Sequence, residues 1–168
     1  MIVRKGLSKV PSQDQVDAVD ARLLLALART PRATISALAA DTGLSRNTVQ
    51  SRVNRLEERG VLGSFERRVD PRALGYPLRA LMTVQVTQSV LGPVAAELRA
   101  IPEVLEVAGI SGPADLFVQV VARDTDDLYR IAGQVLAIPG VERTDTALVM
   151  RDLVDHRLTP LLERRAYP

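Results

Sequence analysis

The stretch A-T-I-S-A-L-A-A-D-T-G-L-S-R-N-T-V-Q-S-R-V-N-R-L-E-E-R-G, residues 33–60, decides how the first half of the chain folds. Thr34 and Ser45 are residue types that cap helix N-termini, and each precedes a run with apolar residues at helical spacing. Gly43, between the two runs, permits a tight left-handed turn. The spacing therefore predicts two helices joined by a tight glycine turn, at 34–42 and 46–59.

The flanking residues complete this unit. Apolar residues at helical spacing predict a further helix over 16–28. The run V-L-G-S-F-E-R-R-V at 61–69 predicts a strand, which gives a helix-turn-helix domain of winged-helix character over 16–69. Residues 1–15 are polar and carry basic side chains without periodicity, so we expect a flexible arm. Residues 70–78 hold two prolines and a glycine and are interpreted as a linker.

The second half follows another pattern, which predicts a ferredoxin-like domain over 79–151 and an α+β fold class for the whole chain. The sequence A-I-P-E-V at 100–104 recurs as A-I-P-G-V at 137–141, as expected for a doubled βαβ unit. No element is predicted for the C-terminal segment, 152–168. The expected order is strand 80–87, helix 90–100, strand 104–111, strand 116–122, helix 124–136 and strand 141–150.

Such a sheet has two helices on one face and leaves the other face bare. Apolar residues on a bare face need a partner, so we expect this domain to hold a homodimer together. Side chains alternate between the two faces along each strand. The residues expected to face the helices are Met82, Val84, Val118 and Val120, and their neighbours are expected on the bare face. The residues of the bare face are Leu81, Leu105, Val107, Phe117, Val121 and Leu148.

Composition excludes several classes of protein. The chain has no cysteine, so disulfides and thiolate metal sites are excluded, and the single histidine, His156, has no second histidine with which to share a metal. No apolar run approaches the roughly 20 residues of a membrane span, and the first residues lack the apolar core of a signal peptide. We expect a cytoplasmic protein with no catalytic residues, no metal and no cofactor.

Charge divides unevenly along the 168 residues. Residues 1–75 carry 13 Lys and Arg against 8 Asp and Glu, whereas residues 76–168 carry 9 against 12. A basic first half favours a polyanionic partner for that half alone. A basic surface that is only solvated has the same charge balance. Charge alone therefore does not decide between a nucleic-acid partner and a solvated surface.

The helix at 46–59 carries groups that could read DNA, because the second helix of a helix-turn-helix lies in the major groove. Val49, Val53 and Leu56 fall on one side and should face the core. Amides, hydroxyls and a guanidinium lie opposite, and these groups can hydrogen-bond base edges. Any surface helix turns polar residues outward, but the absence of acidic residues before Glu57 and Glu58, at the far end, favours DNA. The predicted base-reading residues are Asn47, Thr48, Gln50, Ser51 and Arg55, with Asn54 on the same face, and the predicted phosphate contacts are Ser45, Arg46 and Arg52.

Motifs in both halves resemble the Lrp/AsnC family of bacterial and archaeal transcription regulators, also called feast/famine regulators. The resemblance spans roughly residues 16–150 and implies a dimer, often associated into tetramers or octamers, that binds double-stranded DNA. It also implies a second domain that assembles dimers and senses small molecules, usually amino acids. The motifs are V-D-A-V-D-A-R-L-L-L-A-L at 16–27, the helix-turn-helix at 33–62, D-P-R-A-L-G at 70–75, G-P-A-D-L-F-V-Q-V at 112–120 and P-G-V-E-R-T-D-T at 139–146.

The resemblance also implies an effector site between dimers, for which we select Gly112, Asp115, Thr144 and Thr146. Backbone N–H groups at Gly112 could approach a carboxylate, Asp115 could pair with an ammonium group, and the threonines could supply hydroxyls. The alternative is a hairpin turn whose backbone Asp115 bonds, followed by ordinary strand threonines. The family often has G-x-Y-D here, and this chain has G-P-A-D without the aromatic residue.

Three functions compete at this point. The first is a transcription regulator modulated by an amino acid or similar molecule. The second is an effector-independent architectural protein that bends or coats DNA, which the altered loop favours. The third is an enzyme, for which the sequence offers no nucleophile–base pair, no phosphate-binding glycine loop and no HExxH motif. The three aspartates at 124–127 are interpreted as the acidic first turn of a helix. The sequence favours the regulator.

Overall fold

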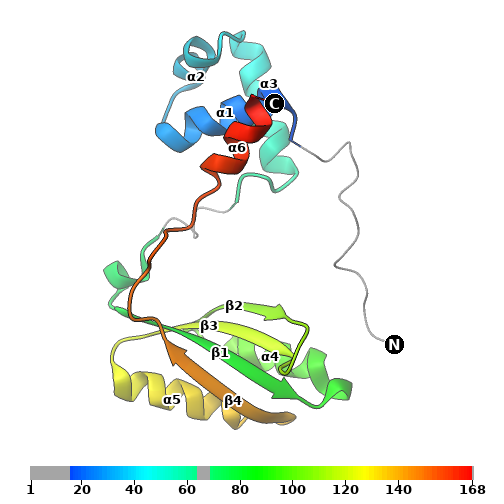
Figure 1. Ribbon diagram of the computed structural model, residues 1–168, viewed down its shortest axis with the longest axis vertical. Helices are drawn as coiled ribbons and strands as arrows, with labels where there is room; N and C mark the ends of the chain where they lie inside the picture. The colour runs from blue at the N-terminus through cyan, green and yellow to red at the C-terminus, as the bar shows by residue number, and fades with distance from the viewer. Residues whose placement is uncertain (1–15, 64–68, 168) are drawn as a thin grey trace. The chain divides into compact units, whose positions relative to one another are not determined.

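The computed structural model describes residues 16–63 and 69–167, which divide into two compact units (Figure 1). One unit lies within residues 1–64 and 155–168, and the other within 65–154. The arm expected at 1–15 lies outside the described residues, as does most of the strand expected at 61–69, and Val61 and Leu62 form bends. In the described ranges, no helix has the length and apolar character needed to cross a membrane.

The first unit contains the three helices expected from the sequence. In each, the side chain of the preceding residue, Asp17, Thr34 or Ser45, accepts a hydrogen bond from the third backbone N–H of the helix. Gly43 adopts φ 70°, the left-handed conformation that the tight turn requires. Local capping therefore sets where these helices begin. The helices are α1 (Ala18–Arg29), α2 (Ile35–Thr42) and α3 (Arg46–Glu58).

A fourth helix, α6 (Thr159–Ala166), lies in the segment 152–168, for which the sequence pattern predicts no element. Its Leu162 and Ala166 pack against Ala21 and Leu25 of α1. The chain thus returns to the first unit after completing the second, and the C-terminal segment becomes part of the helix-turn-helix unit.

The second unit has the predicted β-α-β-β-α-β order. Its four strands form one antiparallel sheet in the order β2-β3-β1-β4, with short 3-10 turns at Pro71–Leu74 and Gln88–Val90. This confirms the ferredoxin-like arrangement. The elements are β1 (Leu78–Val86), α4 (Leu91–Ala100), β2 (Val104–Gly109), β3 (Leu116–Ala122), α5 (Thr125–Leu136) and β4 (Val141–Leu148).

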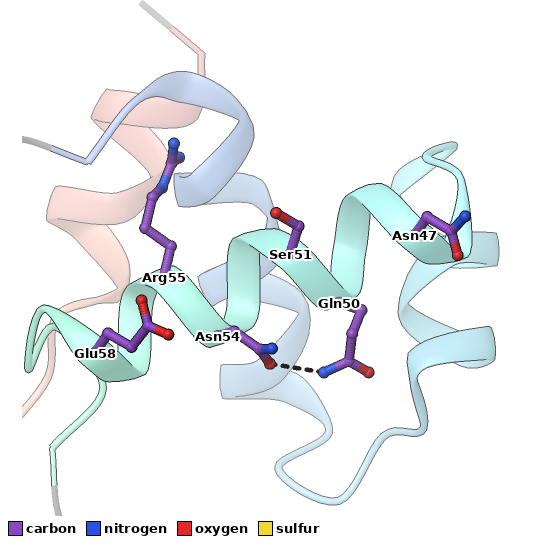
Figure 2. Close-up of a pocket in the computed structure, with 6 residues that line it drawn as sticks. All are labelled: Asn47, Gln50, Ser51, Asn54, Arg55 and Glu58. Carbon is purple, nitrogen blue, oxygen red and sulfur yellow. Dashed lines mark hydrogen bonds between the residues drawn. The ribbon is translucent and has the colours of Figure 1, made fainter.

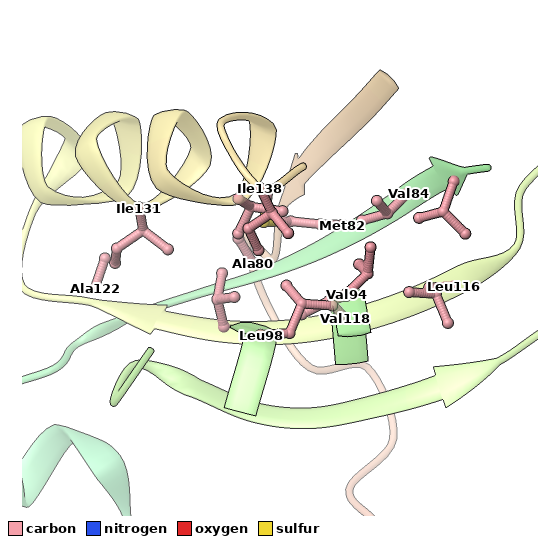
Figure 3. Packing of buried hydrophobic residues seen from close by; sticks show 13 residues of the cluster. Ala80, Met82, Val84, Val94, Leu98, Leu116, Val118, Ala122, Ile131 and Ile138 are labelled. Atoms are coloured by element: carbon pink, nitrogen blue, oxygen red, sulfur yellow. The ribbon is translucent and has the colours of Figure 1, made fainter. Parts of the chain in front are cut away.

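The core of this unit lies between the sheet and its two helices (Figure 3). Met82 and Val118 point from the central strands towards Leu98 of α4 and Ile131 of α5, and all four are fully buried. Because both helices cover the same face, alternate residues of β1 and β3 are left on the other, open face.

Two residues expected on the open face lie on the helix-covered face instead, so their placement was wrong. The register of β2 shifts between Val104 and Glu106, and Val107 therefore pairs with Val118 and packs against the core. Leu148 pairs with the buried Ala80, and directly paired residues share a face. Leu81, Phe117 and Val121 keep the alternation predicted for the open face, and Leu105 falls in the irregular part of β2.

Asp127, in the first turn of α5, is a buried carboxylate held by two arginines. Arg123 donates to it from Nε at 3.1 Å and from its backbone N–H at 3.0 Å, and Arg130 donates from Nη2 at 2.7 Å. The hydrogen bonds from Arg123, and then that from Arg130, hold the pKa of Asp127 far below its ordinary value. A lowered pKa contributes stability that is present above the unfolded-state value of 3.8 and is lost as pH falls.

We therefore expect Asp127→Asn to lower the Tm by several degrees at pH 7, and the gap from the unsubstituted chain to narrow as pH falls below about 4. Thermal unfolding followed by circular dichroism over pH 3–7 measures this. Asp126→Asn, which changes an exposed carboxylate on the same turn, is the control. A gap that stays constant across that range would contradict the role of the ionised Asp127 carboxylate.

Candidate nucleic-acid interface

Helix α3 is fixed on one side and exposed on the other. Val49 and Leu56 are fully buried and Val53 is half-buried, as the helical spacing predicts. The backbone N–H of Gly43 donates to the carbonyl of Ala39, which ends α2 and lets the chain turn into α3. The core contacts therefore determine which face of α3 remains free.

The free face is a shallow hollow of polar side chains (Figure 2). Asn47, Gln50 and Ser51 lie exposed along it, as predicted, and Asn54 lies one turn beyond Gln50. The Nε2 of Gln50 donates a 2.7 Å hydrogen bond to Oδ1 of Asn54. Such a surface offers amide and hydroxyl groups to the edges of bases.

The start of α3 is organised by hydroxyl groups. The Ser45 Oγ accepts a 3.1 Å hydrogen bond from the backbone N–H of Thr48. The same oxygen lies 2.8 Å from Oγ1 of Thr48. Ser45 and Thr48 are thus partly engaged with each other, while the side chain of Arg46 is exposed beside them. An exposed cation next to a helix N-terminus suits a phosphate group.

Two other predicted contacts, Arg52 and Arg55, form ion pairs with α1. The Arg52 Nη1 lies 2.6 Å from Oδ1 of Asp20 and 2.7 Å from Oδ2 of Asp17, and the Arg55 Nη2 lies 3.2 Å from Oδ2 of Asp20. Partial burial opposes ionisation of Asp17, but the hydrogen bond from Arg52 holds the pKa of Asp17 below its ordinary value. Arg52 thus joins α3 to α1, whereas the sequence pattern places it at the margin of the reading face.

Sequence reasoning did not find Asp17 and Asp20 as functional residues. The sequence pattern that could have indicated them is an aspartate at the N-cap of α1 and a second aspartate three residues later, on a face that is otherwise apolar. Asp20 is almost completely buried, and a carboxylate in that position needs cationic partners. These two residues position the helix that carries the polar face.

Glu58 also lines the hollow, at its far end beyond Arg55. This agrees with the sequence, in which Glu57 and Glu58 come only at the far end of the helix. Asn47 and Glu58 are eleven residues apart, about 16 Å along a helix, so the carboxylate stands at the opposite end from the helix N-terminus. The free face is polar throughout and is acidic only at that end.

The residues selected for an effector lie in two separate places in the second unit. Gly112, with φ 135°, and Asp115 lie in the loop between β2 and β3. Oδ2 of Asp115 accepts a 2.9 Å hydrogen bond from the Val86 backbone N–H, and Gln88 donates to its other oxygen. The carboxylate of Asp115 is thus engaged within the fold.

Thr144 and Thr146 lie on β4, where they pair with Val84 and Met82. They therefore share the helix-covered side of the sheet, and β1 separates them from β3 and its preceding loop. Thr144 is half-buried and Thr146 is exposed. Within one chain the structure brings each pair together but does not join the two pairs.

No group of three or more His, Asp and Glu side chains gathers as around a metal ion in residues 16–63 and 69–167. The polar side chains of the candidate site are hydrogen-bonding groups on the exposed face of α3.

Comparison with known protein families gives two matches that together span most of the chain. Residues 16–62 match the model of a winged helix-turn-helix DNA-binding domain, and residues 79–159 match that of the Lrp/AsnC ligand binding domain. The boundary between the matches falls within the segment that joins the two units.

Individual proteins show the same likeness. The chain is 31% identical over 136 residues to the HTH-type transcriptional regulator FL11 of Pyrococcus horikoshii, covering 81% of this chain and 90% of that one. It is 36% identical over 142 residues to the HTH-type transcriptional regulator AldR of Mycolicibacterium smegmatis, covering 82% and 83%. A feast or famine regulatory protein from M. tuberculosis, solved with L-methionine, superimposes with a TM-score of 0.75 at 30% identity, covering 86% and 98%.

Proposed function

This chain belongs to the Lrp/AsnC family of helix-turn-helix transcription regulators, and from that premise we propose that α3 reads specific DNA sites while an amino acid or similar molecule modulates binding. We propose further that the active form is a dimer or a larger assembly of dimers. A regulator of this kind acts on DNA in the cytoplasm, and we assign no catalytic step, metal or cofactor to it.

The observation that supports DNA reading best is the free face of α3. Its core side is fixed by Val49 and Leu56, and its outer side presents exposed amides and a hydroxyl. A rigid helix with hydrogen-bonding groups on its free face matches the requirements of the major groove.

Selection of bound sequences from random DNA tests this function. The full chain should enrich a discrete site with two related half-sites about one helical turn apart, because a two-fold dimer presents two copies of α3. The selection is repeated with a panel of amino acids, for the unsubstituted chain and for Asp115→Ala. Enrichment of no sequence would contradict the proposal.

The effect of amino acids separates the regulator from its alternative. A change in affinity or assembly that Asp115→Ala abolishes supports an effector site at Gly112, Asp115, Thr144 and Thr146, completed between dimers. The engagement of Asp115 by Val86 and Gln88 favours the alternative, an effector-independent architectural protein. Selected sites and affinities that no amino acid changes would support that alternative.

Base reading is expected to be separable from phosphate binding. Asn47→Ala or Ser51→Ala should each remove about 1–3 kcal/mol of discrimination at one position of the half-site, because a side chain that meets a base edge is lost. Arg46→Ala should instead weaken selected and unrelated DNA by the same factor. Titrations of both DNAs by fluorescence anisotropy measure this. Equal weakening by all three variants would remove the reading role of Asn47 and Ser51.

The open face of the sheet is expected to form the dimer. Leu81→Arg places a cation on that face, so the sedimenting mass should fall from twice 18.3 kDa towards 18.3 kDa at micromolar concentration. Leu136→Arg, at a half-exposed leucine of α5, is the matched control and should remain a dimer. An unsubstituted chain that sediments as a monomer at that concentration would contradict the assignment.

A further inference from the structure

Four polar side chains of α3 and its N-cap already have partners within the fold, so fewer side chains remain to contact bases. The Ser45 and Thr48 hydroxyls lie within hydrogen-bond distance of each other, and Arg52 and Arg55 are tied to Asp20. Gln50 and Asn54 differ from these, because they are hydrogen-bonded to each other and both stay exposed in the hollow. This amide pair is the most organised exposed feature of the reading face.

The hydrogen bond between the two amides restricts how Gln50 can turn. Oδ1 of Asn54 accepts from Nε2 of Gln50 at 2.7 Å, and Figure 2 shows the two amide groups facing each other one turn apart. An inverted Gln50 amide would place its Oε1 against Oδ1 of Asn54, and two acceptors repel each other. With Oδ1 of Asn54 turned towards Gln50, as in the structure, Gln50 keeps Oε1 and the second hydrogen of Nε2 free.

A free acceptor beside a free donor matches one base in the major groove. Adenine presents the N6 amino donor next to the N7 acceptor, and a carboxamide can bond both at once. Guanine presents two acceptors, N7 and O6, and would leave Oε1 of Gln50 opposite another acceptor. Cytosine and thymine each offer only one of the two partners.

We propose that Gln50, oriented by Asn54, reads an adenine in each half-site, an assignment that rests on the proposed function of α3 in DNA binding. Gln50 is the contacting residue and Asn54 is a positioning residue.

Selection from random DNA with variants of the full chain tests the assignment. Gln50→Met keeps the length of the side chain and removes the amide, so one A·T position of each half-site should lose about 5- to 150-fold of its discrimination. Asn54→Leu should weaken the preference at that same position, and Asn54→Asp, which keeps the acceptor oxygen, should restore it relative to the other bases. Gln134→Met, the same change on α5, is the control for the substitution itself.

A modified base tests the contact atom by atom. Placing 7-deazaadenine at the affected position removes the N7 acceptor, so it should weaken binding by the unsubstituted chain and have little effect on Gln50→Met. Thermal unfolding of each variant shows whether it is folded, because all the substituted side chains are exposed.

The outcomes distinguish this assignment from the function on which it rests. If the unsubstituted chain selects a site and Gln50→Met changes no base preference, or changes one at a G·C pair, the adenine assignment is wrong and DNA reading by α3 stands. If Asn54→Leu leaves that preference intact, the positioning role is wrong. If the unsubstituted chain selects no sequence, both the assignment and the proposed function fail.

Discussion

Replacing Asp20 by alanine should lower the free energy of unfolding of the first unit by about 3 kcal/mol, because removing one partner of a buried ion pair leaves the other uncompensated. The Asp20 side chain is only 2% exposed, and its two oxygens meet Arg52 at 2.6 Å and Arg55 at 3.2 Å. Arg52 keeps Asp17 as a partner after this substitution, and its side chain is 24% exposed. We therefore expect a loss of stability at the lower end of the range for breaking a buried ion pair. Urea unfolding followed by circular dichroism measures the change.

An exposed ion pair in the same unit gives a matched control. Asp41 lies 2.6 Å from Arg29, and both side chains are about half exposed or more. Because exposed ion pairs contribute little, Asp41→Ala should change the free energy of unfolding by less than about 1 kcal/mol. If Asp20→Ala costs no more than Asp41→Ala, the buried network does not hold α3 against α1.

DNA affinity should fall about a thousandfold between 50 and 200 mM salt. If a dimer neutralises about six phosphates, log K falls with log[salt] at a slope near −5, because each neutralised phosphate releases condensed counterions. The basic first half and the exposed Arg46 motivate this expectation. Fluorescence anisotropy over a salt series measures the slope, and a slope shallower than −2 would contradict phosphate-dominated binding.

Single substitutions can assign part of that slope. Arg46→Ala should make it shallower by about 2 in a dimer, since one phosphate contact is lost from each chain. Arg99→Ala removes an exposed cation from α4 in the second unit and should leave the slope unchanged. Deleting residues 1–12, which carry Arg4, Lys5 and Lys9, tests whether the arm also contacts phosphates. An unchanged slope would show that the arm is only solvated.

Elements set by local interactions could be predicted from the sequence. Thr34 and Ser45 cap α2 and α3, and Gly43 takes the left-handed turn that its lack of a Cβ permits. The bounds of β3, Leu116–Ala122, match the expected strand, because an apolar run between turn residues is a local signal. The polar face of α3 follows likewise from the 100° helical spacing that buries Val49 and Leu56.

Only the tertiary structure decided how distant residues meet. Arg52 lies among polar residues in the sequence, so it is expected at the margin of the polar face of α3. Its partner Asp20 lies 32 residues away on α1. A one-residue change of register moves a side chain to the other face of a sheet, and the irregularity in β2 does this to Val107 without a turn residue to announce it. Helix α6 docks on α1 because Leu162 and Ala166 meet an apolar patch formed by Ala21 and Leu25. Caps and turns act within a few residues, whereas pairing partners and register depend on which surfaces the whole fold brings together.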